Sequence, residues 1–154
     1  MRCIAFQLGE GHFALPLRAL VEVLPLLPVR ALAHAPAGVA GVINYRGQVV
    51  PVLDLCQLAL GQPCAERVST RLLVLRWQQA GREIGLLALM VERALSELRI
   101  DPKSLTPPPL RIDATPYLAG LAVAASGLVQ LIDVSRLLSE AVAGLLYPEA
   151  ATLP

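Results

Sequence analysis

Short alternations of apolar and polar residues dominate this chain, a pattern typical of half-buried β-strands. Two such stretches, residues 42–45 and 48–53, are separated only by Arg46 and Gly47, which predicts a β-hairpin. Glycine takes positive φ at little steric cost, so the turn can hold the Arg46 guanidinium at a strand end. Taken alone, such an arginine is most simply a solvated turn residue.

The hairpin pattern recurs in the second half of the chain. Residues 41–54, GVINYRGQVVPVLD, and residues 120–133, GLAVAASGLVQLID, share a leading glycine, two strand patterns around a glycine turn, and a final aspartate at the same spacing. Each aspartate, Asp54 or Asp133, precedes a short helical pattern that its carboxylate can cap. The second copy lacks the arginine of the first.

The repeat extends upstream, where residues 2–8 and a matching strand after residue 70 each lead into a polar turn and further strands. Two units of about five closely spaced short strands predict an all-β fold with two similar small barrels that share an apolar interface. A single sandwich would show less internal symmetry. We expect the subdomain cores in residues 14–61 and 65–138, with the first strand near the interface.

Two further stretches are distinctive: the end of the chain, and one uncharged window that is long enough to cross a membrane. Residues 137–146 predict a C-terminal helix, and residues 147–154 a mobile tail. The window 114–132 has no charged residue, but proline, glycine and polar residues interrupt it, and it alternates like two strands. We therefore predict no membrane insertion. The N-terminus does not resemble a signal peptide, so a cytoplasmic location is expected.

Composition narrows the function. Of the 154 residues, 55% are hydrophobic and 16% are charged, and the formal net charge is +1. Nucleic acid is not an expected partner, because a nucleic-acid-binding domain would show a basic stripe with interleaved aromatic residues. The apolar content suits a chain that buries a substantial core.

Candidate chemistry is sparse. Cys3, Cys56 and Cys64 show no zinc-ligand spacing, and only His12 and His34 could join them. We expect buried thiols and neither a metal nor a cofactor. No histidine has an evident nucleophile partner, the carboxylates are scattered, and no glycine-rich phosphate loop precedes a helix. The chain is therefore predicted not to be an enzyme, with no catalytic residues.

The order of these segments resembles the CheW-like domain, the coupling module of bacterial chemosensory arrays. The likeness spans roughly residues 2–138 and is strongest at GVINYRGQVVPVLDL, followed by RLLVLRWQQAGREIGLLAL and GLVQLIDVSRLL. It implies one CheW-like domain over residues 1–146, built from two five-stranded SH3-like β-barrel subdomains. The chain departs from the family at Leu89, where an acidic residue is usual, and the apolar segment 86–90 is either buried or a partner-binding patch.

The resemblance also implies a non-catalytic function. Such a domain is a scaffold that links methyl-accepting chemoreceptors to the regulatory domain of a CheA-type histidine kinase, in the cytoplasm at membrane-associated receptor arrays. Other CheW-like domains are implied as further partners. The receptor tip would bind a groove between the subdomains, near Leu20, Glu22, Gly41, Asn44 and Arg46. The alternative is a small-molecule-binding β-barrel, which is disfavoured because aliphatic side chains usually fill small barrels.

The groove residues have physical roles to match. Leu20, with Val23 or Leu24, offers apolar area to a helical partner. Arg46 with Glu22 would orient that partner through charge-assisted hydrogen bonds. Core packing explains Leu20 equally well, and a position on a solvated face explains Glu22 equally well. Asn44 is expected to fix the hairpin backbone, as asparagine often does near turns.

Overall fold

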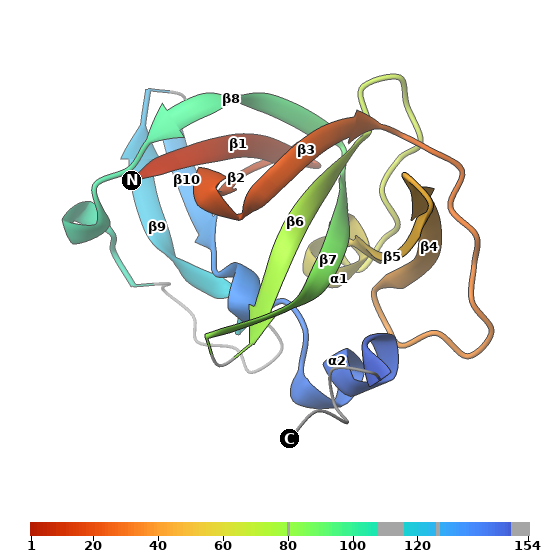
Figure 1. The fold of residues 1–154 in the computed structure, drawn as a ribbon. Coiled ribbons are helices and arrows are strands. Elements are labelled where there is room, and N and C mark those ends of the chain that lie inside the picture. Colours follow the sequence, from red (N-terminus) through yellow and green to blue (C-terminus); the bar gives the residue numbers. More distant parts are fainter. Residues whose placement is uncertain (80, 108–115, 126, 149–154) are drawn as a thin grey trace.

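The computed structural model describes residues 1–79, 81–107, 116–125 and 127–148, which form two five-stranded sheets with short helices (Figure 1). The strands are β1 (Arg2–Leu8), β2 (Gly11–Pro16), β3 (Leu20–Pro25), β4 (Val39–Tyr45), β5 (Gln48–Asp54), β6 (Arg71–Gln79), β7 (Arg82–Val91), β8 (Arg93–Arg99), β9 (Leu118–Ala124) and β10 (Gly127–Ile132). The helices are α1 (Leu55–Leu60), α2 (Glu140–Leu146) and three 3-10 turns, η1 (Leu17–Ala19), η2 (Pro102–Ser104) and η3 (Val134–Arg136). The predicted all-β class, with a C-terminal helix, is confirmed.

The two sheets are built alike. Sheet A has the strand order β8-β1-β2-β10-β9, and sheet B has the order β3-β6-β7-β5-β4. Each contains one parallel pair at the equivalent position, β10 with β2 and β5 with β7. The first five strands of the chain therefore correspond one by one to the last five, as the sequence repeat predicts.

The repeats exchange hairpins between the sheets. The hairpin β1–β2 belongs to the first repeat but pairs with β8 and β10 of the second, while β6–β7 completes sheet B beside β3 and β5. The ranges 14–61 and 65–138 thus describe the repeat along the chain, whereas each sheet takes strands from both. Local patterns do not reveal the exchange, because equivalent strands offer the same pairing edges in either arrangement.

The main core lies between the sheets. It joins Phe6 and Leu15 of sheet A to Leu73 and Leu89 of sheet B in one buried cluster. Leu89 is fully buried and pairs with Leu73, and residues 87–90 are at most 5% exposed. The apolar segment that departs from the family pattern is therefore core for most of its length rather than a partner-binding patch.

The C-terminal helix begins later than the sequence predicts. Residues 134–136 form η3, and α2 starts at Glu140, because Ser139 Oγ caps it by accepting a 3.2 Å hydrogen bond from Val142 N. The apolar period continues through residues 137 and 138, but their side chains are buried by packing outside a helix.

The mobile tail was predicted to start at residue 147, but Tyr147 packs against the rest of the protein. Its ring stacks on Trp77 at 5.7 Å between centroids, and its hydroxyl donates a 2.6 Å hydrogen bond to Leu86 O. Gly85 makes room for this ring, since a Cβ there would come within 2.9 Å of it. The last residues of the predicted tail, 149–154, lie outside the described residues.

The uncharged window forms strands. Over its described part, residues 116–125 and 127–132, it contributes β9 and β10. Within the described ranges, none of the helices combines the length and apolar character that crossing a membrane requires.

Candidate partner-binding site

The β4–β5 hairpin turns at Arg46 and Gly47, whose φ angles are 52° and 83°. Two positive φ values in a two-residue loop are the signature of a type I′ turn, which matches the strand twist. Asn44 Oδ1 accepts a 2.8 Å hydrogen bond from Gly47 N, so the expected role of Asn44 in fixing the turn is confirmed.

Arg46 makes an ion pair with Glu22. Its Nη2 donates to both carboxylate oxygens, at 2.5 and 3.2 Å, and its guanidinium carbon lies 5.2 Å from the centroid of the Tyr45 ring. Glu22 is on β3 and Arg46 follows β4, the two opposite edges of sheet B. The contact therefore links the edges of a strongly curled sheet.

The ion pair is unevenly exposed. The side chain of Arg46 is 73% exposed and that of Glu22 is 26% exposed. Within the described part of the chain, Nε and Nη1 of Arg46 have no hydrogen-bond acceptor. A guanidinium held by one nitrogen keeps its other donors for a carboxylate or carbonyl of a partner.

Gly41 and Leu20 pack inward. Gly41 is buried with φ 149°, and a Cβ there would lie 2.0 Å from Arg30 O. Arg30 and Val42 exchange two 2.9 Å backbone hydrogen bonds across this contact, so Gly41 lets the loop after β3 dock on β4. Leu20 is half-buried against the main core. The structure thus brings Glu22 of β3 to Arg46 at the hairpin turn that Asn44 fixes, and places Gly41 and Leu20 in supporting positions.

Three exposed valines lie near this hairpin, and two of them, Val21 and Val49, escaped the sequence prediction. Val21 and Val23 on β3 are 37% and 38% exposed, and Val49, which pairs with Asn44, is 71% exposed. The alternation along β3 places the valines on the face opposite Glu22. Because both faces of this strand carry apolar residues, the sequence alone does not indicate which face is outward.

A hollow of about 470 Å³ lies between the two sheets. Its charged lining residues are Arg18, Arg76 and Asp133, and Arg76 Nη1 donates a 3.4 Å hydrogen bond to Arg18 O. None of the five predicted receptor-groove residues is among the described residues that line it. The predicted site and the hollow are therefore separate features of the surface.

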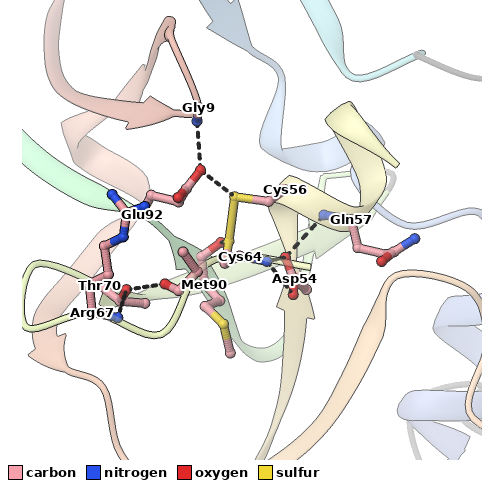
Figure 2. Close-up of a disulfide and its surroundings, with 10 residues drawn as sticks. Gly9, Asp54, Cys56, Gln57, Cys64, Arg67, Thr70, Met90 and Glu92 are labelled. Carbon is pink, nitrogen blue, oxygen red and sulfur yellow. Dashed lines mark hydrogen bonds between the residues drawn. A yellow bond between two sulfur atoms is a disulfide. The ribbon is translucent and has the colours of Figure 1, made fainter. Parts of the chain in front are cut away.

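The cysteines differ from the expectation of three free thiols. Cys56 and Cys64 form a disulfide with 5.0 Å between their Cα atoms (Figure 2). Only Cys3 is a free, buried thiol. The pairing depends on the loop after α1 returning to the helix, which residue spacing does not reveal. Burial raises the pKa of the Cys3 thiol, which disfavours a nucleophilic thiolate there.

Asp54 lies against this disulfide. The ligand atoms of Asp54, Cys56 and Cys64 are within 4.8 Å of one another. The Asp54 carboxylate accepts hydrogen bonds from Gln57 N at 3.0 Å and from Cys64 N at 3.1 and 3.2 Å. Its predicted capping of α1 is confirmed, and its oxygens accept hydrogen bonds from the backbone of α1 and of the loop at Cys64.

These features define a class of protein before any comparison. Two similar β-sheets enclose an interior filled by side chains, which leaves the small-molecule alternative without support. The exposed features are an arginine with free donors, apolar strand residues and an inter-sheet hollow. Such a surface suits a protein-binding scaffold.

Comparison with known proteins identifies the family. The profile of the CheW-like domain matches residues 2–142. The chemotaxis protein CheW of Rhizobium meliloti (strain 1021) is 33% identical over 106 residues, which cover 69% of this chain and 65%, just under two thirds, of that protein. Protein FrzA of Myxococcus xanthus is 31% identical over 140 residues, 88% of this chain and 84% of FrzA. The chain belongs to the CheW-like domain family, and as a member it is a non-catalytic chemotaxis scaffold.

The fold agrees with this assignment. The crystal structure of the scaffolding protein TtCheW from Thermoanaerobacter tengcongensis superimposes with a TM-score of 0.72, at 23% identity, over 85% of this chain and 87% of TtCheW. The shared region extends across both sheets, so the hairpin exchange belongs to a fold that is already known.

Proposed function

We propose that this protein couples methyl-accepting chemoreceptors to the regulatory domain of a CheA-type histidine kinase, in a cytoplasmic array at the membrane. The observation that carries the proposal is the family match over residues 2–142, which includes both sheets and the first three residues of α2. Because the match is continuous, the surfaces needed for two partners can both be present. Other CheW-like domains would add lateral contacts in the same array.

We assign the receptor contact to the face of sheet B around the Glu22–Arg46 pair. Arg46 has donors there that find no acceptor among the described residues, and Val49, near the start of β5, supplies exposed apolar area. A receptor tip is a helical hairpin, and an amphipathic helix is recognised by apolar contacts flanked by polar ones. In this assignment Leu20 and Gly41 support the surface from beneath, and Asn44 holds the turn.

The first prediction tests this face with Arg46→Glu. The variant places a carboxylate against Glu22 and removes the donors, so we expect binding to a receptor cytoplasmic hairpin to weaken by about tenfold or more. The melting temperature should stay close to that of the wild type, because an exposed ion pair contributes only about 0–1 kcal/mol. Calorimetric titration with the receptor hairpin and, separately, with the kinase regulatory domain measures both contacts; kinase binding should persist.

Two control variants sharpen the result. Arg2→Glu breaks a comparable exposed ion pair, Arg2–Glu97 on sheet A, and should leave receptor binding intact. The exchange Glu22→Arg with Arg46→Glu restores the attraction with reversed polarity. If receptor binding returns in this double variant, the pair acts only through the fold and the assigned contact is wrong. A wild-type protein that binds neither partner contradicts the proposed function itself.

A further inference from the structure

The disulfide lies where segments of both sheets meet (Figure 2). Cys56 is in α1, which follows β5, and Cys64 is in the loop that leads to β6. Glu92 connects β7 of sheet B to β8 of sheet A, and its Oε1 accepts a 2.7 Å hydrogen bond from Gly9 N in the β1–β2 turn. The two sulfurs are therefore next to the junction on which the arrangement of the sheets depends.

Each sulfur faces an acceptor in addition to the other sulfur. Cys64 Sγ lies 3.4 Å from Met90 O, and Cys56 Sγ lies 3.6 Å from Glu92 Oε1. A disulfide has no S–H group, so these contacts become hydrogen bonds only when both cysteines are reduced. Buried donors are rarely left without acceptors, and each S–H group of the reduced pair has an acceptor here. The surroundings are thus arranged for the dithiol as well as for the disulfide.

We propose that Cys56 and Cys64 are a reversible thiol–disulfide switch at the sheet junction. The oxidant is a small-molecule disulfide such as glutathione disulfide. One cysteine thiolate attacks it and releases one glutathione thiol, and the second cysteine then attacks the protein sulfur of the mixed disulfide and releases the other. Two electrons pass from the cysteine sulfurs to the two glutathione sulfurs, and the two protons end on the released thiols.

The switch controls the loop between α1 and β6. In the oxidised protein the disulfide ties this loop to α1, eight residues away in sequence. In the reduced protein the loop keeps the Asp54 contact to Cys64 N and its internal bond from Thr70 Oγ1 to Ala65 O. Reduction therefore loosens an exposed segment, in which Val68 is 96% exposed, without removing the anchors of the fold.

A disulfide is rarely permanent in the compartment proposed above. Cytoplasmic disulfides in mesophiles are usually transient or redox-sensing, because glutathione and thioredoxin keep thiols reduced. This step rests on the proposed function and location, whereas the two sets of sulfur contacts do not. Cys56 and Cys64 are only 1% and 6% exposed, so exchange requires local opening of the loop and should be slower than for a surface thiol.

A redox titration of the purified full chain tests the switch without either protein partner. The protein is equilibrated in buffers in which the ratio of reduced to oxidised glutathione is varied. It is then quenched with acid, unfolded and alkylated, and mass spectrometry counts the alkylated thiols. We expect two thiols to disappear together over a defined range of ratios and to return on the reverse titration, while the Cys3 thiol persists. Cys3→Ser should titrate like the wild type, and Cys56→Ser and Cys64→Ser should not. A pair that stays oxidised, or stays reduced, at every ratio overturns the proposal.

Glu92→Gln tests the second acceptor. The amide oxygen can still accept from Gly9 N but is a weaker acceptor for the Cys56 thiol, so the disulfide should persist to a ratio of reduced glutathione about threefold higher or more. Hydrogen exchange across residues 61–70 should be about tenfold faster in the reduced wild type than in the oxidised one. An unmoved midpoint with equal exchange in the two states overturns the switch, as does stoichiometric Zn²⁺ uptake by the reduced pair that blocks its oxidation.

Discussion

Two glycines of the same hairpin region, Gly41 and Gly47, have positive φ but very different surroundings. A side chain at Gly41 would collide with the backbone of Arg30, whereas a Cβ at Gly47 would have nothing within 4 Å. Gly47 is therefore needed only for its backbone conformation. Gly41 is needed for a close approach between two chain segments, which is a constraint set by the tertiary structure.

The second prediction compares alanine at these positions. Gly47→Ala should lower the free energy of unfolding by about 1 kcal/mol, the cost of a left-handed conformation for a side chain. Gly41→Ala should cost on the order of 3 kcal/mol, because the loop at Arg30 must move off β4. Urea unfolding followed by fluorescence of Trp77 measures both. Equal losses in the two variants would show that the close contact at Arg30 is not needed.

The third prediction concerns Tyr147. Burial raises the pKa of its phenol above the ordinary value of about 10, so the folded state favours the protonated form. The unfolded chain releases this proton more readily, and the stabilisation is complete below about pH 10 and decreases as the pH rises above it. Tyr147→Phe removes the donor to Leu86 O and should cost about 1–2 kcal/mol at pH 7.

The pH dependence separates this mechanism from a simple loss of packing. Between pH 10 and 11 the wild type should lose about 1 kcal/mol that the phenylalanine variant keeps, so the difference between them narrows. Tyr117, whose pKa burial also raises, is present in both proteins and cancels. Urea unfolding at pH 7, 10 and 11 gives the comparison; a gap that does not change with pH contradicts it.

At this scale, the sequence is most informative where a side chain acts on its own backbone. Asn44 fixes the turn three residues ahead, and Asp54 caps the helix that follows it, so residue type and spacing predicted both. The Cys56–Cys64 bond and the contact under Gly41 depend on segments that only the folded chain brings together. The ion pair of Glu22 with Arg46 is intermediate: a family resemblance suggested both residues, but their contact required the curled sheet.

At the scale of elements, Asp54 joins three pieces of structure. It ends β5, caps α1 and holds the backbone of Cys64, and it is 7% exposed. Asp133, its counterpart in the second repeat, caps only the turn η3. It is more exposed and forms a surface ion pair with Arg136. The duplicated aspartates have therefore acquired unequal structural importance.

The fourth prediction uses that inequality. Asp54→Ala leaves the buried Cys64 N without an acceptor and removes a helix cap, so it should cost about 2–4 kcal/mol. Asp133→Ala should cost about 1 kcal/mol, the usual value of an exposed cap. Thermal unfolding by circular dichroism, under reducing and oxidising conditions, compares the two. The larger loss should persist in the reduced protein; equal losses would mean that the contact to Cys64 contributes little.

At the scale of the whole molecule, the exchanged hairpins make the two sequence repeats depend on each other. Sheet A lacks its middle strands without β1 and β2, and sheet B lacks its middle strands without β6 and β7. The repeat itself was visible in the glycine and aspartate spacing, because it reflects local turns and caps. The exchange was not, because the hydrophobic alternation of a strand defines its faces and leaves its neighbours open.

The fifth prediction follows from this dependence. A chain cut in the loop after residue 66 yields two fragments that each hold one repeat. Each should be largely unfolded alone, since the central hairpin of each sheet and the strands that it pairs with are then in different fragments. Mixed at equal concentration, the fragments should recover the spectrum of the intact protein. Nuclear magnetic resonance of each fragment, alone and mixed, measures this. A fragment with dispersed resonances on its own would contradict the mutual dependence.

The parallel pairing of β2 with β10 also has a consequence for how the chain folds during its synthesis. Phe13 of β2 lies opposite Gln130 of β10, so the earliest strands to leave the ribosome must wait for nearly the last. Sheet B, whose strands run without interruption from β3 to β7, can assemble in the meantime. The emerging β1–β2 hairpin would then spend most of translation with an unpaired edge and uncovered apolar side chains, which makes this segment a natural target for chaperones that bind nascent chains.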